Sequence, residues 1–193
     1  MYIGEIQIFF KKFENSQMDC ISGLGKYDIR CLFNYACRYK TLNIVKFFCD
    51  KLITQEHLIY YQDTYSVAFT HACDGNNLDV MTYLYDNYVI NPNIFSGKYF
   101  ILLKPCKFGY IDTIRFITEK FPDLNYRPHR KKLIDYCCNR GYYDLLYYLK
   151  SKYTNFDNGI RHERHPIASH DEAFIEWFRA GCPIRTNMKS AKK

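Results

Sequence analysis

Cysteine and histidine are the residues of this chain best suited to chemistry, because thiolates and imidazoles bind metals and act as nucleophiles or bases. The sequence holds nine cysteines and six histidines. Four of the cysteines recur at intervals of about 33 residues, namely Cys37, Cys73, Cys106 and Cys138. Whole repeats separate these thiols, too far for them to share one zinc ion. We therefore predict free thiols packed in a core, in a reducing compartment.

The second candidate for chemistry is a group of histidines at His162, His165 and His170, followed by Cys182. With a carboxylate they could hold a metal or serve an enzyme. Their intervals match no zinc motif, and charged neighbours suggest a solvated loop. The sequence also contains no phosphate-binding glycine loop, nucleophile elbow or zinc-protease motif. We expect no enzyme and no cofactor, and an enzyme at this histidine group is the alternative that a metal assay tests.

The segments around the four spaced cysteines are copies of one another. They align without gaps at residues 36–48, 72–84, 105–117 and 137–149, and a shortened fifth copy follows at 168–178. Each full copy begins with a small residue and Cys and passes through a polar turn. It then continues with an apolar residue, Asn or Asp, a mainly apolar pair, a variable residue, an aromatic residue and an apolar one. A recurrence of this period is typical of a repeat architecture.

Both halves of each copy place apolar residues three or four apart, which is the spacing of one helix face. Gly109 and Gly141 mark the turn between the halves in two copies, and the pairs 76–77 and 40–41 replace them in the others. Each copy is thus predicted to be a helix, a tight turn and a second helix. Since a lone pair of short helices buries too little surface, the pairs must stack. The sequence predicts an all-α solenoid of stacked helix–turn–helix repeats.

The small residue before Cys, the glycine-bearing turn and the second-helix pattern resemble ankyrin-repeat proteins. In its abundance of Tyr, Asn, Ile, Lys and Cys, the chain resembles the ankyrin-like proteins encoded by large DNA viruses. The family's Thr-Pro-Leu-His motif is absent from every copy. We expect a capping segment at 1–29, about five ankyrin-like repeats at 30–184 and a basic tail at 185–193. Residues 3–13 have one apolar side, which favours a capping helix over the alternative of a membrane-surface helix.

The resemblance also implies where a partner would bind. In an ankyrin stack the first helices line the concave side, and their outward residues vary to suit the partner. In this sequence, the outward positions of the first helices correspond to Tyr35, Arg38, Tyr39, His71, Asp74, Lys104, Lys107, Phe108, Tyr136, Asn139 and Arg140. Tyr, Arg and Phe are enriched in protein interfaces, and the later half of the set is basic. We expect it to bind an acidic protein surface, with a structural spacer as the alternative.

Composition and charge limit which other classes of protein this chain could belong to. Apolar residues make up 48% of the chain, which predicts a folded protein, and the formal net charge of +7 favours acidic partners. Basic stretches at 127–132 and 185–193 make a nucleic-acid-associated accessory protein the alternative and would permit nuclear entry. No apolar run approaches the roughly 18 residues of a membrane span. We expect an intracellular protein, and the resemblance to viral ankyrin-like proteins implies a host protein as its partner in the host cytoplasm.

Overall fold

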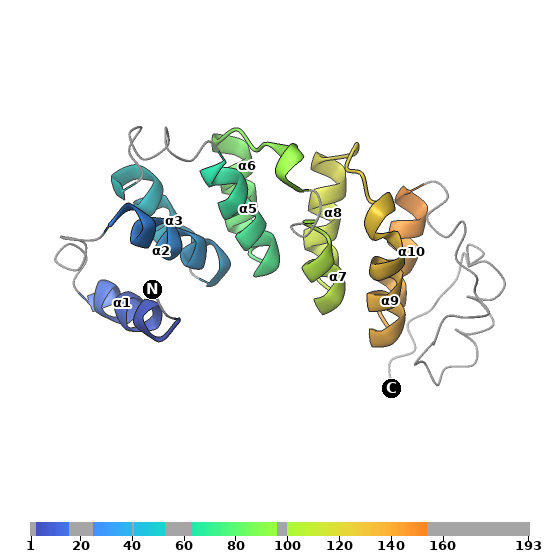
Figure 1. Ribbon diagram of the computed structural model, residues 1–193, viewed down its shortest axis with the longest axis horizontal. Coiled ribbons are helices and arrows are strands. Elements are labelled where there is room, and N and C mark those ends of the chain that lie inside the picture. The colour runs from blue at the N-terminus through green and yellow to red at the C-terminus, as the bar shows by residue number, and fades with distance from the viewer. Residues whose placement is uncertain (1–2, 16–24, 40, 53–62, 96–99, 154–193) are drawn as a thin grey trace.

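The computed structural model describes residues 3–15, 25–39, 41–52, 63–95 and 100–153. All regular elements within these ranges are helices, so the fold class is all-α, as predicted. Short helices follow one another in pairs along the long axis of the molecule (Figure 1). The shortened copy at 168–178, the histidine group and the basic tail lie outside the described residues.

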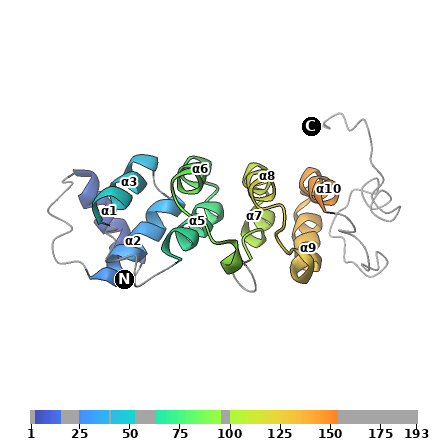
Figure 2. The same cartoon turned by 90° about the horizontal axis from the view of Figure 1, so that it is seen from above.

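Four helix pairs correspond to the four aligned copies, so the prediction of helix, turn and helix is confirmed for them. The first helices are α2 (Lys26–Tyr39), α5 (Thr64–Asp74), α7 (Leu103–Phe108) and α9 (Arg130–Arg140). The second helices are α3 (Leu42–Phe47), α6 (Leu78–Asn87), α8 (Ile111–Lys120) and α10 (Tyr143–Lys152). The other elements are α1 (Ile3–Asn15), the π-helix η1 (Phe48–Leu52) and the 3-10 helices η2 (Pro92–Phe95) and η4 (Arg127–His129). Seen from above, the first and second helices form two rows (Figure 2).

The turn inside three of the pairs depends on one residue in the left-handed region. Gly109 and Gly141 have φ of 74° and 69°, and Asn76 occupies the equivalent position with φ of 56°. Asparagine is one of the few residues with a side chain that tolerates this conformation. The replacement of glycine in the second copy therefore keeps the same turn geometry.

The predicted apolar stripes form the core. In the second half of each copy the middle position of the stripe is at most 2% exposed and the last is fully buried, whereas the first is half-buried. These stripes are Leu42, Val45 and Phe48; Leu78, Met81 and Leu84; Ile111, Ile114 and Ile117; and Tyr143, Leu146 and Leu149. The four spaced cysteines are at most 1% exposed, which confirms the predicted packed thiols. Burial is the main cause that raises the pKa of Cys37, Cys73 and Cys106, so these thiols stay protonated and are poor nucleophiles.

The helix predicted near the N-terminus is also present. Ile6, Phe9 and Phe10 of α1 are buried. The ring of Phe10 lies 5.4 Å from that of Tyr35 on α2 and 6.1 Å from that of Phe48, measured between ring centroids. The buried side of α1 therefore packs against the first helix pair.

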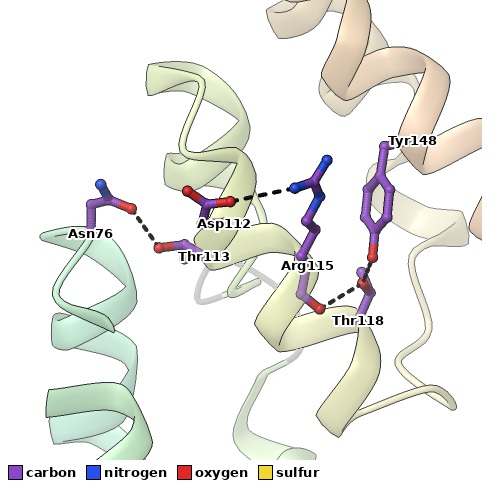
Figure 3. A network of polar contacts seen from close by, with 6 residues as sticks. All are labelled: Asn76, Asp112, Thr113, Arg115, Thr118 and Tyr148. Carbon is purple, nitrogen blue, oxygen red and sulfur yellow. Dashed lines mark hydrogen bonds and ion pairs between the residues drawn. The ribbon is translucent and has the colours of Figure 1, made fainter. Parts of the chain in front are cut away.

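Side-chain hydrogen bonds join neighbouring pairs (Figure 3). Thr113 of α8 donates from Oγ1 to Oδ1 of Asn76, the left-handed residue of the preceding turn, at 2.7 Å. Between α8 and α10, the hydroxyls of Thr118 and Tyr148 lie 2.7 Å apart, and Thr118 Oγ1 also donates to the carbonyl oxygen of Arg115 at 3.1 Å. The Thr113–Asn76 and Thr118–Tyr148 bonds thus link the third pair to the second and to the fourth, although the Thr-Pro-Leu-His motif is absent.

Removal of the Thr113 hydroxyl tests this link. The Thr113→Val substitution keeps the side-chain shape in a fully buried position and removes the bond to Asn76. We expect the free energy of unfolding in urea to fall by about 1 kcal/mol, the usual net worth of such a bond. The matched control is Thr82→Val at an exposed position of α6, where we expect a change within about 0.5 kcal/mol. Equal effects of the two substitutions would contradict a role for the bond.

Candidate partner-binding face

The eleven residues expected to contact a partner all lie on first helices. Tyr35, Arg38 and Tyr39 are on α2; His71 and Asp74 on α5; Lys104, Lys107 and Phe108 on α7; and Tyr136, Asn139 and Arg140 on α9. Tyr39 and Phe108 are 55% and 42% exposed, which is high for aromatic side chains. Five members of the set are only half-buried, because they also pack on neighbours: Tyr35, Arg38, His71, Asp74 and Tyr136.

The α2 residues form one aromatic and basic group. The rings of Tyr35 and Tyr39 lie 4.7 Å apart, and the Arg38 guanidinium carbon lies 4.9 Å from the centroid of the Tyr39 ring. A planar guanidinium beside an exposed tyrosine is an arrangement typical of energetic centres in protein interfaces. This end of the face therefore offers apolar area and a positive charge together.

An ion pair joins the next two helices. Nζ of Lys104 on α7 donates to Oδ2 of Asp74 on α5. The Asp74 side chain is only 11% exposed and Lys104 is 45% exposed, so the carboxylate is engaged while part of the lysine faces solvent. Two predicted contact residues thus partly neutralise each other.

His71 lies beside this pair. Burial lowers its pKa, the Asp74 carboxylate raises it, and the charges of Lys104 and Arg38 lower it further, with a net shift downward from the ordinary value. A histidine with a lowered pKa is mostly neutral at pH 7. His71 therefore supplies a neutral imidazole, with a nitrogen that donates and one that accepts.

The α7 and α9 residues supply exposed positive charge. Lys107 Nζ lies 5.7 Å from the centroid of the Phe108 ring, and Lys132 Nζ lies 6.0 Å from that of Tyr136. Arg140 is exposed at the end of α9. Lysine ammonium groups lie near aromatic rings here, as in a surface that presents both apolar area and charge.

Charge divides between the two rows of helices. The four first helices carry nine Lys and Arg against three Asp and Glu, whereas the four second helices carry five of each. The first-helix row therefore holds most of the excess positive charge of the described helices. Such an asymmetry directs acidic partners to one face of a molecule.

The structure adds residues that the sequence analysis missed. A hollow of about 570 Å³ is lined by Ile6 and Gln7 of α1, by Cys31 and Asn34 of α2, and by four members of the predicted set: Tyr35, Arg38, Tyr39 and His71. Cys31 and Asn34 precede Tyr35 and Arg38 by four residues, so helical spacing alone could have placed them on the same face. The contribution of α1 carried no such signal, because it depends on how α1 packs.

Other candidate sites are limited by what the structure covers. Among the residues that it describes, no group of three His, Cys, Asp or Glu side chains could hold a metal ion. No helix in the same ranges is long and apolar enough to cross a membrane. The stretch at 127–132 forms η4 and the start of α9, with Lys131 and Lys132 exposed.

Comparison with known proteins identifies no relative. No protein-family model, curated protein or solved structure matches this chain.

Proposed function

We propose that this chain is a non-catalytic interaction module, an ankyrin-like solenoid whose first-helix row binds an acidic surface of a partner protein. The observation that carries the proposal is the charge asymmetry between the rows, with nine basic and three acidic residues on the first helices against five of each on the second. Exposed Tyr39 and Phe108 on the same row support it, since interfaces combine aromatic anchors with Arg and a polar rim.

The resemblance to viral ankyrin-like proteins gives the proposal a setting. We propose that the partner is a host protein and that the chain acts inside the host cell. On this view α1 caps the first repeat. The protonated state of the buried cysteines supports a structural role for these thiols over a catalytic one.

A charge-reversal variant tests the binding face. A partner would first be isolated on the immobilised chain from host-cell lysate, identified and purified. Its Kd would then be measured for the wild type and for Lys107→Glu with Arg140→Glu, at two exposed positions of α7 and α9. Since charge reversal at an interface loses attraction and adds repulsion, we expect at least tenfold weaker binding, about 1.4 kcal/mol, with unchanged helicity.

The matched control reverses two charges on the second helices. Lys120→Glu with Lys152→Glu changes the net charge by the same amount, at exposed positions of α8 and α10. We expect its Kd to stay within about twofold of the wild type, since surface charges outside an interface add little. If both double variants lost affinity equally, net charge and not the first-helix row would determine binding.

Nucleic acid is the second candidate, because exposed Lys131 and Lys132 add to the positive row near the start of α9. Binding to phosphates releases counterions, so the affinity for nucleic acid falls steeply and linearly on a log–log plot against salt concentration. Titration of a labelled duplex and a labelled single strand at several salt concentrations separates the two candidates. Tight binding with such a slope would favour nucleic acid over a protein partner.

A further inference from the structure

The hollow at the α1 end of the first-helix row has the features of a binding pocket. Its volume of about 570 Å³ lies within the roughly 300–1,000 Å³ of ligand sites in proteins. Residues of three helices line it, from α1, α2 and α5. On α2, Cys31, Asn34 and Arg38 recur at intervals of three and four residues, so they share one helix face. The walls are therefore built mainly on regular helices and hold their side chains in defined places.

Two polar groups in the wall of the hollow have no hydrogen-bond partner among the residues that the structure describes. They are Nε of Arg38 and Oδ1 of Asn34, and both atoms are buried. Buried polar atoms without partners are rare in proteins, because each carries the cost of lost hydration. A small rotation of the Arg38 side chain would bring Nε to the hollow, where a ligand could accept a hydrogen bond from it and remove part of that cost. The amide of Asn34 could donate to the same ligand through its nitrogen.

The charge of the hollow selects the kind of ligand. None of its described lining residues is acidic. Asp74, the acidic neighbour of His71, is engaged by Lys104 across the α5 and α7 helices. Arg38 thus faces no carboxylate in the wall of the hollow, and the tyrosines beside it supply ring surface for the methylene groups of a ligand. An anionic group on a short aliphatic stem fits these walls.

We infer that this hollow receives a single glutamate or aspartate side chain of the partner protein, with its carboxylate on the Arg38 guanidinium and its stem against Tyr35 and Tyr39. This inference rests on the proposed function and names the contact that anchors the partner. The planar fork of a guanidinium matches a carboxylate with two parallel hydrogen bonds. Sites for phosphorylated peptides gather several arginines, whereas this hollow holds one. A carboxylate is therefore the favoured anion.

Nuclear magnetic resonance of the whole chain with two short probes tests the pocket. The first probe is the capped peptide Gly-Ser-Glu-Ser-Gly, and the second has Gln in place of Glu. We expect the glutamate peptide to shift the Arg38 Nε–Hε resonance and the side-chain amide resonances of Asn34 and Gln7, with saturation in the millimolar range. The glutamine peptide should cause at least tenfold smaller shifts at equal concentration, because hydrogen bonds to charged groups are the stronger ones.

Two variants locate the effect. Arg38→Gln should weaken the binding of the glutamate peptide about tenfold or more, and Arg38→Lys, which keeps the charge but not the fork, should weaken it by an intermediate factor. Lys120→Glu, at an exposed position of α8 outside the first-helix row, should leave the peptide shifts unchanged. Circular dichroism of each variant shows whether it is folded. The comparison of the two peptides on the wild-type chain does not depend on the variants.

The outcomes distinguish this inference from the proposed function. Equal shifts with the two peptides, or shifts that persist in folded Arg38→Gln, would contradict the binding of a carboxylate to Arg38 in this hollow. Inorganic phosphate that shifts the same resonances at concentrations tenfold lower than the glutamate peptide would also overturn the choice of a carboxylate. If the pocket fails while Lys107→Glu with Arg140→Glu still weakens binding of the purified partner, the first-helix row remains the binding face.

Discussion

Replacement of Phe69 by alanine is expected to lower the free energy of unfolding by about 3–5 kcal/mol, the usual cost of removing a buried phenylalanine ring. Phe69 of α5 is fully buried. Its ring centroid lies 6.0 Å from that of Phe95, 6.2 Å from that of Phe116 on α8 and 5.7 Å from that of Phe121. The ring therefore fills the space between the second helix pair and the third.

The position of Phe69 makes the effect larger than that of a local cavity. In a stack of repeats each pair contacts only its neighbours, so stability depends on the interfaces between pairs. We expect urea unfolding followed by circular dichroism to show the loss. Phe108→Ala is the matched control, because the same side chain is 42% exposed on α7 and should cost under about 1 kcal/mol. Similar losses for the two variants would contradict the packing described for the second and third pairs.

The Gly75→Ala substitution is expected to lower stability by about 3 kcal/mol, at the upper end of the usual cost of overpacking. A Cβ atom at Gly75 would lie 2.0 Å from the backbone oxygen of Arg38 and 2.8 Å from its carbonyl carbon. Backbone atoms cannot rotate out of the way as a side chain can, so α2 and α5 would have to move apart. Since φ of Gly75 is −96°, the backbone conformation itself suits alanine, and the cost comes from the contact alone.

Gly4→Ala provides a control of opposite sign. Gly4 lies within α1, and a Cβ atom there would meet nothing within 4 Å. Alanine is the stronger helix former, so we expect stability to rise or stay level, by up to about 1 kcal/mol. Thermal unfolding of Gly75→Ala and Gly4→Ala measures the change in stability of each variant relative to the wild type. A Gly75→Ala variant as stable as the wild type would show that the first two pairs are not in such close contact.

Much of the fold was predictable from the sequence because the signal repeats four times. The stripe ending in Phe48 in the first copy recurs as the one ending in Leu84 in the second, and both are buried. The spaced cysteines needed no alignment with other proteins, since their recurrence already placed them between helices. The substitution of Asn76 for a turn glycine was also readable, because asparagine tolerates the same left-handed conformation.

The binding face was less predictable, because exposure at each position depends on the neighbouring pair. The sequence placed Asp74 and Lys104 on one face but could not show that they pair with each other. It also gave no sign that Ile6 and Gln7 of α1 would complete a hollow with Arg38, since that contact joins residues far apart in the chain. Local periodicity determines which side of a helix is buried, whereas a pocket depends on packing between helices.

The proposed binding face requires that the four helix pairs stack in one row, so that their first helices form a single continuous face. One distance measurement tests it, between spin-labelled amino acids incorporated at exposed Tyr39 of α2 and exposed Arg140 of α9, which occupy equivalent positions in the first and fourth copies. Three packing steps separate these two helices, and each step is about 8–10 Å between helix axes. Double electron–electron resonance should therefore give a main distance of about 24–30 Å between the two spin labels. A main population near the roughly 10 Å of directly packed helices, seen as dipolar broadening of the spectrum, would contradict the row and the binding face built on it.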